Sequence, residues 1–174
     1  MLLVLLIDVS ESMRPYEKAL NSALSEIKKN FDMINGNECK RIIAVQFSSE
    51  IKLSYKFPSK LAFNGRTALY DAIYIAANYA LNAVSISDED KCVVGILTDG
   101  ENNKGHVGAK KAAEIIEKLS AKNNVNVTMY CPFPDQQKLE FGTFEMRNVE
   151  FKKFVADEAT FFEFSQTMSQ SLVA

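Results

Sequence analysis

Two short apolar runs dominate the pattern of hydrophobic and polar positions along the chain. Residues 2–7 (LLVLLI) are apolar without interruption, and residues 91–98 (KCVVGILT) carry polar side chains only at their ends. Runs of this length are too short for a membrane span, which needs about 20 residues. They are also too continuous for a half-exposed strand, in which apolar and polar residues alternate. We therefore expect both runs to be strands buried on both faces of a sheet.

Helical periodicity follows each of these runs. Apolar positions spaced by three and four residues predict amphipathic helices at 15–31, 69–84 and 109–119. Pro15 is expected in the first turn of the first helix, where proline is well tolerated. The alternation of strand and helix predicts an α/β fold, in a single domain that spans residues 1–174.

Further strands are expected at 41–47, 51–57 and 125–131. The link between the first two is only residues 48–50, which allows a hairpin but no crossover. The strand at 51–57 should therefore be antiparallel and lie at the sheet edge.

The pattern weakens beyond Pro132. We expect a short helix at 136–145, a strand at 149–155 and a closing helix at 158–172. Phenylalanines are frequent in this last part of the chain. Most of them should cover the sheet, and an exposed few would form a surface for a partner.

Charge and cysteine content narrow the classes of function. The chain has 20 Lys and Arg residues against 22 Asp and Glu, and its formal net charge is −2. The basic surface that nucleic acid requires is therefore not expected. Three widely spaced cysteines look like reduced core residues, which favours a reducing compartment. No stretch resembles a secretory leader or a bilayer span, so we expect a cytoplasmic protein without a membrane partner.

Oxygen-bearing side chains gather where the two apolar runs end and where the second helix begins. They are Asp8, Ser10 and Ser12 after the first run, Asp99 after the second, and Thr67 before the helix. The carboxyl ends of the strands line the ligand crevice in open α/β sheets, so these side chains should face it. A donor set made only of oxygen suits Mg²⁺ or Mn²⁺ better than Zn²⁺, which prefers thiolate or imidazole ligands.

Three motifs built from these residues resemble a known family. Asp8-Val-Ser-Glu-Ser12, Thr67 within Gly-Arg-Thr-Ala-Leu-Tyr-Asp, and Asp99 within Thr-Asp-Gly are similar, in order and separation, to the metal-ion-dependent adhesion site of von Willebrand factor A domains. The resemblance covers essentially the whole chain. It implies a three-layer, doubly wound, Rossmann-like sheet of six mostly parallel strands in the order 3-2-1-4-5-6, with one antiparallel edge strand.

The resemblance also implies how such a site works. The hydroxyls of Ser10, Ser12 and Thr67 would contact the metal, while Asp8 and Asp99 would hold it mainly through waters or through hydrogen bonds to those hydroxyls. A cation held mostly by neutral oxygens keeps much of its charge, so an Asp or Glu of a partner protein can complete its coordination. The expected cofactor is Mg²⁺, or Mn²⁺ or Ca²⁺. The expected function is cation-dependent protein binding without catalysis.

Each of these residues also has a purely structural interpretation. Ser10, Ser12 and Thr67 precede helices and would serve as N-caps. Asp8 would lie near the positive end of a helix, and Asp99 would belong to a turn. Caps do not explain two carboxylates at the ends of adjacent buried strands, which is why the metal site is the preferred interpretation.

Two further acidic residues lie next to the motifs. Glu11 stands where Gly is frequent in the family. It either faces solvent or adds a third carboxylate, which would strengthen metal binding but weaken the attraction for a partner's acid. Asp71, one turn into the helix after Thr67, is expected to act through the helix dipole or through a hydrogen bond behind the ligands, so it is left out of the metal set.

Two other classes of function stay open. A Mg²⁺-dependent phosphatase or phospho-acceptor domain would use Asp8 as its nucleophile. The phosphatase needs an acid two positions on, where this chain has Ser10, and the phospho-acceptor needs a lysine at a later strand end. A metal-free scaffold would bind through the phenylalanine-rich last third or the Pro132-Phe133-Pro134 loop. The single histidine, His106, is expected in a solvated loop. The sequence gives neither the partner nor the oligomeric state.

Overall fold

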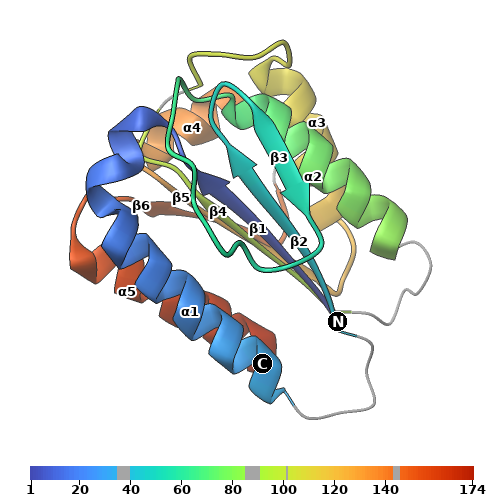
Figure 1. Cartoon of the computed structure of the whole chain (residues 1–174). Helices are drawn as coiled ribbons and strands as arrows, with labels where there is room; N and C mark the ends of the chain where they lie inside the picture. Colours follow the sequence, from blue (N-terminus) through green and yellow to red (C-terminus); the bar gives the residue numbers. More distant parts are fainter. Residues whose placement is uncertain (35–39, 85–90, 101, 143–145) are drawn as a thin grey trace.

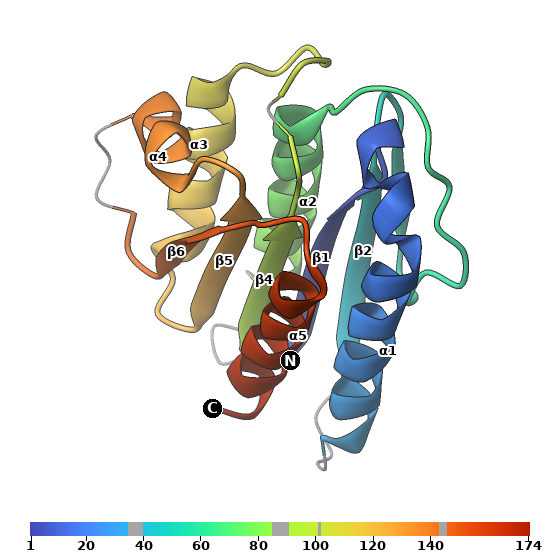
Figure 2. The same ribbon diagram turned by 90° about the vertical axis from the view of Figure 1, so that its left-hand side faces the viewer.

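The computed structural model describes residues 1–34, 40–84, 91–100, 102–142 and 146–174. In these residues a six-stranded sheet lies between two layers of helices (Figures 1 and 2). In chain order the elements are β1 (Leu2–Asp8), the 3₁₀ helix η1 (Glu11–Tyr16), α1 (Glu17–Met33), β2 (Arg41–Phe47), β3 (Ile51–Ser54), α2 (Leu69–Val84), β4 (Cys92–Leu97), α3 (Ala109–Ser120), β5 (Val125–Cys131), α4 (Pro134–Phe141), β6 (Val149–Lys153) and α5 (Glu158–Val173).

The strand order is β3-β2-β1-β4-β5-β6, as the resemblance implied. Neighbouring strands are parallel except β2 and β3, which pair antiparallel with Phe47 opposite Ile51. The hairpin expected from the short link is therefore confirmed. The doubly wound arrangement places β1 and β4 side by side in the middle of the sheet, with their carboxyl ends at the same edge.

The unbroken apolar run of β1 is explained by its two covered faces. Every residue of this strand is buried. Leu2, Val4 and Leu6 belong to the core beneath α2 and α3, and the alternate residues belong to the core beneath α1 and α5. Figure 1 shows α1 and α5 on one face of the sheet and α2, α3 and α4 on the other. A strand covered on both sides has no polar face, so alternation disappears.

Several element ends differ from expectation. Pro15 lies inside η1 and not in the first turn of α1. Since proline lacks a backbone N–H, the regular α-helical ladder starts only after it. Strand β3 stops at Ser54, whose hydroxyl accepts a hydrogen bond from Lys56 N (3.1 Å) where the chain turns away from β2. Helix α4 begins at Pro134, two residues earlier than predicted.

The C-terminal part has the three expected elements with shifted ends. Helix α4 ends at Phe141, before Gly142 with its positive φ of 90°, and residues 143–145 of the predicted helix lie outside the described residues. Strand β6 stops at Lys153. Most described phenylalanines of this part are buried or half-buried, whereas Phe133 is 57% exposed and Phe162 is 65% exposed.

Two of the three cysteines, Cys92 and Cys131, are free and buried, as expected of core residues. Cys39 lies outside the described residues. Among the described helices, none is both long and apolar enough to cross a bilayer.

Candidate metal centre

Asp8 is the innermost of the predicted site residues. It is the last residue of β1 and is fully buried. Its Oδ1 accepts a hydrogen bond from the backbone N–H of Ser10 (2.8 Å), and its Oδ2 accepts one from the Thr98 hydroxyl (2.6 Å). The Thr98 backbone N–H in turn donates to Tyr130 O on β5. The carboxylate is thus fixed between the ends of the central strands.

A chain of hydroxyl contacts leads outward from this carboxylate. The Ser10 and Ser12 hydroxyl oxygens lie 3.1 Å apart, and the Ser12 hydroxyl donates to Asp99 Oδ1 at 3.1 Å. Ser10 is buried, Asp99 is half-buried and Ser12 is exposed. The structure therefore brings Asp8, Ser10, Ser12 and Asp99 into one network that runs from the core to the surface, although Asp99 is 87 residues from Ser12 in sequence.

Thr67 reaches the same place from the mouth of α2. The residue is 2% exposed. A Cβ atom placed on Gly100 would lie 3.5 Å from Thr67 Oγ1, so the hydroxyl faces the backbone next to Asp99. All three sequence motifs consequently meet at the carboxyl-end edge of the sheet, the upper edge in Figure 2.

The two carboxylates lie in an unfavourable electrostatic environment. Burial raises the pKa of Asp8 above its ordinary value, and hydrogen bonds from Thr98 and Ser10 oppose that shift. Burial also raises the pKa of Asp99, followed by repulsion from Asp8, while the hydrogen bond from Ser12 acts the other way. Within the described part of the chain, neither carboxylate forms an ion pair with a lysine or arginine. A cation at this place would relieve both effects.

The donor spacing fits a small octahedral ion. Oxygens at neighbouring corners of an octahedron with bonds of about 2.1 Å lie about 3 Å apart. The Ser10 and Ser12 hydroxyl oxygens, 3.1 Å apart, have this spacing, which they share with an ordinary hydrogen bond. No group of three or more His, Cys, Asp or Glu side chains suited to a metal occurs among the described residues. The donor set of this site combines only two carboxylates with hydroxyls.

The capping interpretation does not account for Ser10. This residue occupies the N-cap position of η1, yet its side chain makes no capping hydrogen bond there. Its hydroxyl contacts Ser12 instead. Thr67 lies two residues before the first residue of α2, Leu69, and no hydrogen bond of its hydroxyl occurs among the described residues. These hydroxyls face the network and do not complete helix ends.

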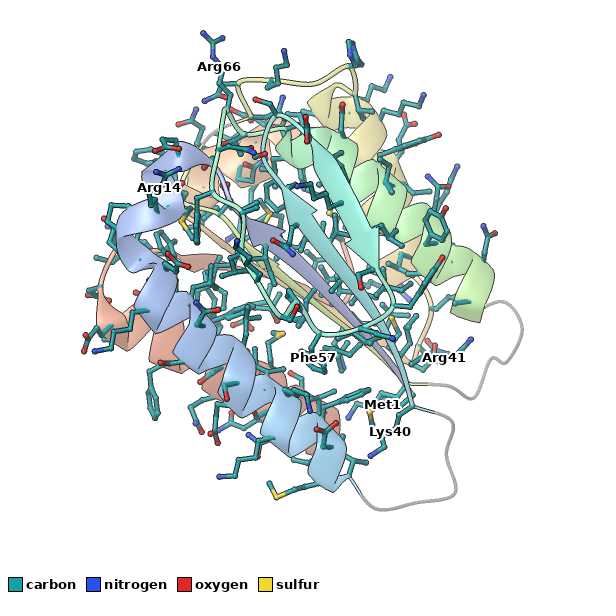
Figure 3. All side chains as sticks on the ribbon, viewed as in Figure 1. Met1, Arg14, Lys40, Arg41, Phe57 and Arg66 are labelled. Carbon is teal, nitrogen blue, oxygen red and sulfur yellow. The ribbon has the colours of Figure 1, made fainter. Side chains whose placement is uncertain are left out.

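Glu11 is turned away from the network. Its carboxylate accepts a hydrogen bond from Arg14 Nη2 at 3.0 Å, and the same nitrogen donates to Phe63 O at 2.8 Å. Both side chains of this ion pair are more than half exposed. Figure 3 shows Arg14 and Arg66 near this end of the molecule, opposite Met1. Of the two alternatives for Glu11, the structure supports the solvent-facing one.

The sequence did not predict most of the contacts that support the site. Thr98 was part of a motif, but its bond to Asp8 depends on the pairing of β1 with β4. Asn102 and Asn103 lie in the loop after β4, and their side-chain oxygens accept hydrogen bonds from Tyr70 N and Thr67 N. Asp71 accepts hydrogen bonds from the backbone N–H groups of His106 and Val107 and so anchors that loop. An asparagine-rich loop predicts hydrogen bonds from nearby backbone N–H groups to the asparagine side chains. The sequence does not predict which backbone groups these are.

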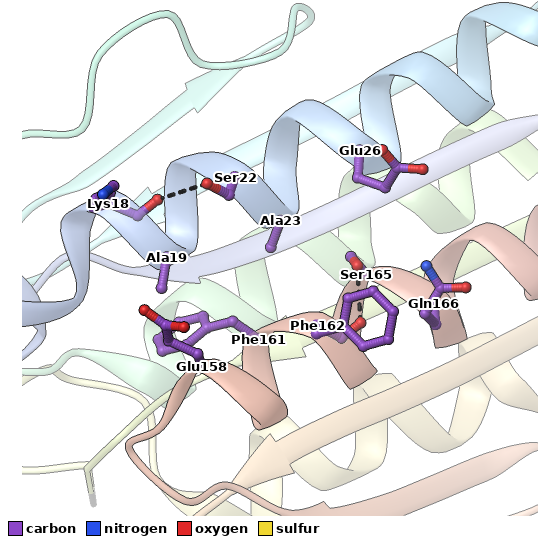
Figure 4. A pocket seen from close by; sticks show the side chains of 10 residues that line it. All are labelled: Lys18, Ala19, Ser22, Ala23, Glu26, Glu158, Phe161, Phe162, Ser165 and Gln166. Carbon is purple, nitrogen blue, oxygen red and sulfur yellow. Dashed lines mark hydrogen bonds between the residues drawn. The ribbon is translucent and has the colours of Figure 1, made fainter.

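A separate hollow lies between α1 and α5 (Figure 4). Its volume is about 500 Å³, and Ala19, Ala23 and Phe161 line it together with the exposed Phe162. It contains none of the five predicted site residues. The network therefore lies at the sheet edge, away from this hollow on the helical flank.

No protein-family model and no curated protein sequence matches the chain. Solved structures do match it. A von Willebrand factor type A protein from Catenulispora acidiphila superposes with a TM-score of 0.67 and 15% identity, over 98% of this chain and 42% of that one. The ArnB paralog VWA2 from Sulfolobus acidocaldarius gives a TM-score of 0.62 and 19% identity, over 98% and 44%.

A third match is to proximal thread matrix protein 1 from the mussel byssus, in a structure with a zinc-occupied MIDAS motif. Its TM-score is 0.60 at 19% identity, and the match covers 98% of this chain and 44% of that one. The chain thus spans less than half the length of these three proteins. The likeness establishes the fold, which is the Rossmann-like fold of von Willebrand factor A domains.

Proposed function

We propose that this domain, which has the von Willebrand factor A fold, binds a protein partner through a divalent cation at the carboxyl end of its sheet. The observation that carries the proposal is the network of Asp8, Ser10, Ser12 and Asp99, in which two neighbouring carboxylates have no cationic partner among the described residues. The surroundings raise the pKa of both Asp8 and Asp99, and a bound cation would stabilise the charged form of these carboxylates.

The residues divide between direct and indirect roles. Ser10, Ser12 and Thr67 would contact the metal through their hydroxyls. Asp99 would support it through the Ser12 hydroxyl, which already donates to it. Asp8 would act from beneath, because it is fully buried and both of its oxygens already accept hydrogen bonds. Mg²⁺ is the proposed ion, with Mn²⁺ or Ca²⁺ as substitutes, since the donors are hard oxygens.

A protein carboxylate is the proposed ligand. The bound cation supplies a position of high positive charge at which an Asp or Glu of the partner can bind. The MIDAS motif of the mussel protein holds zinc, which supports binding of divalent metals at such a site in general. No nucleic-acid or membrane partner is proposed.

An enzymatic role has less support. A phosphatase or phospho-acceptor domain needs Asp8 to attack phosphorus, and the fully buried carboxylate is committed to Ser10 and Thr98. We therefore propose a binding module that is not an enzyme. The free, buried Cys92 and Cys131 agree with a reducing compartment, and we propose the cytoplasm.

The proposal is tested by affinity capture from a lysate of the producing cells, with Mg²⁺ and with EDTA, beside the Asp8→Asn variant. We expect capture of a partner by the parent protein with Mg²⁺, and its loss with EDTA or Asp8→Asn. Capture that persists in EDTA would favour the metal-free scaffold, for which the exposed Phe162 beside the α1–α5 hollow is the candidate contact. Hydrolysis of a chromogenic phosphate with Mg²⁺ would favour the enzyme.

A further inference from the structure

One residue holds the backbone of Thr67 from both sides. Asn103 Oδ1 accepts a hydrogen bond from Thr67 N at 2.9 Å, and Asn103 N donates to Thr67 O at 3.1 Å. Lys104 N adds a second donor to the same carbonyl at 3.1 Å. The loop after β4, which begins next to Asp99, is thereby joined to the mouth of α2. Three hydrogen bonds therefore hold the Thr67 backbone, two of them with Asn103, which is 36 positions away in sequence.

The Thr67 side chain differs from its backbone in the part of the chain that the structure describes. No hydrogen bond of its hydroxyl is present among the described residues, although the residue is only 2% exposed. Threonine is β-branched, so its χ1 angle is restricted and its hydroxyl follows the backbone. Whatever fixes the Thr67 backbone therefore restricts where Oγ1 can lie relative to Asp99 and Gly100.

We propose that Asn103 is a positioning residue that holds Thr67 in the geometry needed to ligate the cation. This inference rests on the proposed function of the site. Asn103 does not contact the metal; it acts through the backbone of Thr67. Residues that orient metal ligands in this way typically change metal affinity by about 10- to 100-fold when they are removed.

The competing explanation is a purely structural role, in which Asn103 only fastens the loop to the backbone at Thr67, two residues before the first residue of α2. Asn102 makes the same type of bond inside the helix, where the first backbone N–H groups lack intrahelical partners, since its Oδ1 accepts from Tyr70 N at 3.1 Å. The two asparagines share a loop and a type of bond, but only Asn103 touches a candidate metal ligand. Asn102→Ala is therefore a matched control.

The test measures Mn²⁺ affinity by titration calorimetry and the melting temperature of the metal-free protein, for the parent chain, Asn103→Ala, Asn102→Ala and Asn103→Asp. Both alanine variants should melt a few degrees lower. Asn103→Ala should bind Mn²⁺ about 10-fold more weakly or worse, and Asn102→Ala should stay within about 2-fold of the parent protein. Asn103→Asp keeps the acceptor for Thr67 N and should bind at least as tightly as the parent protein.

A double-mutant cycle separates positioning from other effects. If Asn103 acts through Thr67, Asn103→Ala should cause no further loss of Mn²⁺ affinity in a Thr67→Ala background. Parent-like Mn²⁺ affinity in Asn103→Ala, beside a lowered melting temperature, would overturn the inference and leave a purely structural role for Asn103. Absence of Mn²⁺ binding by the parent chain would remove the proposed function and this inference with it. If Asn103→Ala does not fold, Asn103→Ser, whose shorter side chain does not reach Thr67 N, replaces it.

Discussion

The Thr98 hydroxyl donates a 2.6 Å hydrogen bond to Asp8 Oδ2, which joins the end of β1 to the end of β4 beneath the site. The same hydroxyl lies 3.2 Å from Gly100 O and accepts from Gly100 N at 3.2 Å. It has one proton and two acceptors within reach, and it gives that proton to the carboxylate in the shorter contact. Thr98 therefore favours the charged form of Asp8, as does Ser10, and an amide at position 8 can be accommodated by rotating one hydroxyl.

Asp8→Asn should abolish the response to metal without unfolding the protein. The amide oxygen can accept from Ser10 N, and the amide nitrogen can donate to Thr98, whose proton then turns to Gly100 O. Asp8→Ala should instead cost about 1–3 kcal/mol, because it leaves the Ser10 and Thr98 donors without their acceptor. Chemical unfolding with and without Mg²⁺ measures both effects. A Mg²⁺-induced stabilisation that survives in Asp8→Asn would contradict the role of this carboxylate.

The stabilisation by Mg²⁺ should increase with pH. Since the pKa values of Asp8 and Asp99 are raised in the folded protein, their contribution to stability is fully present below the ordinary carboxyl value of about 4 and is lost as pH rises through the raised values. A cation offsets that loss only when the carboxylates are charged. At 100 times its dissociation constant, Mg²⁺ should add about 2.7 kcal/mol near pH 7.5 and much less near pH 4.5.

The difference between melting curves with and without Mg²⁺ isolates this effect from other titrating groups. In Asp8→Asn the difference should be small at every pH. A Mg²⁺-induced shift of equal size at pH 4.5 and pH 7.5 would mean that the ion binds elsewhere.

Gly95→Ala should destabilise the domain by about 1–3 kcal/mol. A methyl group on this β4 residue would overlap the Met168 sulfur and would lie 3.2 Å from the Phe164 ring, both on α5. Gly108→Ala is the control, since a Cβ there meets nothing within 4 Å. Gly108 is the N-cap of α3, where alanine is less favourable than glycine, but alanine also reduces the entropy of the unfolded chain, so stability should change by no more than about 1 kcal/mol. Urea unfolding measures both. If the Gly95→Ala variant were as stable as the parent protein, α5 would pack less closely on β4 than the structure shows.

Cys92 and Cys131 should be inert towards thiol reagents in the native protein. Burial raises the pKa of Cys92 to about 12 and that of Cys131 to about 11, so almost no thiolate exists near pH 8. In a Cys39→Ser variant, an aromatic disulfide reagent should release colour only after guanidinium is added. Rapid reaction of two thiols in the absence of denaturant would contradict the burial of these side chains.

The sequence predicted the central elements well because their residues are buried on both faces or along one stripe. Strands β2 and β5 begin and end where the pattern placed them, and the short link fixed the direction of β3. The strand order came from the resemblance and not from periodicity. The ends of η1, β3 and α4 were less predictable, since they depend on local hydrogen bonds such as that between Lys56 N and Ser54.

The candidate site was predictable as far as its motifs extend. Asp8, Ser10, Ser12 and Asp99 are joined by hydrogen bonds, and Thr67 faces Gly100 beside them. The supporting contacts were not predictable, because a bond such as Asn103 to Thr67 joins two loops whose separation depends on the complete fold. Whether these side chains hold a metal stays a prediction.

The most direct measurement is an anomalous difference map from a crystal of the chain soaked in Mn²⁺. We predict a peak at about 2.0–2.3 Å from the hydroxyl oxygens of Ser10, Ser12 and Thr67, and no such peak in crystals of Asp8→Asn. A parent crystal with no anomalous peak at these hydroxyls, at Mn²⁺ concentrations that occupy other sites, would contradict the account.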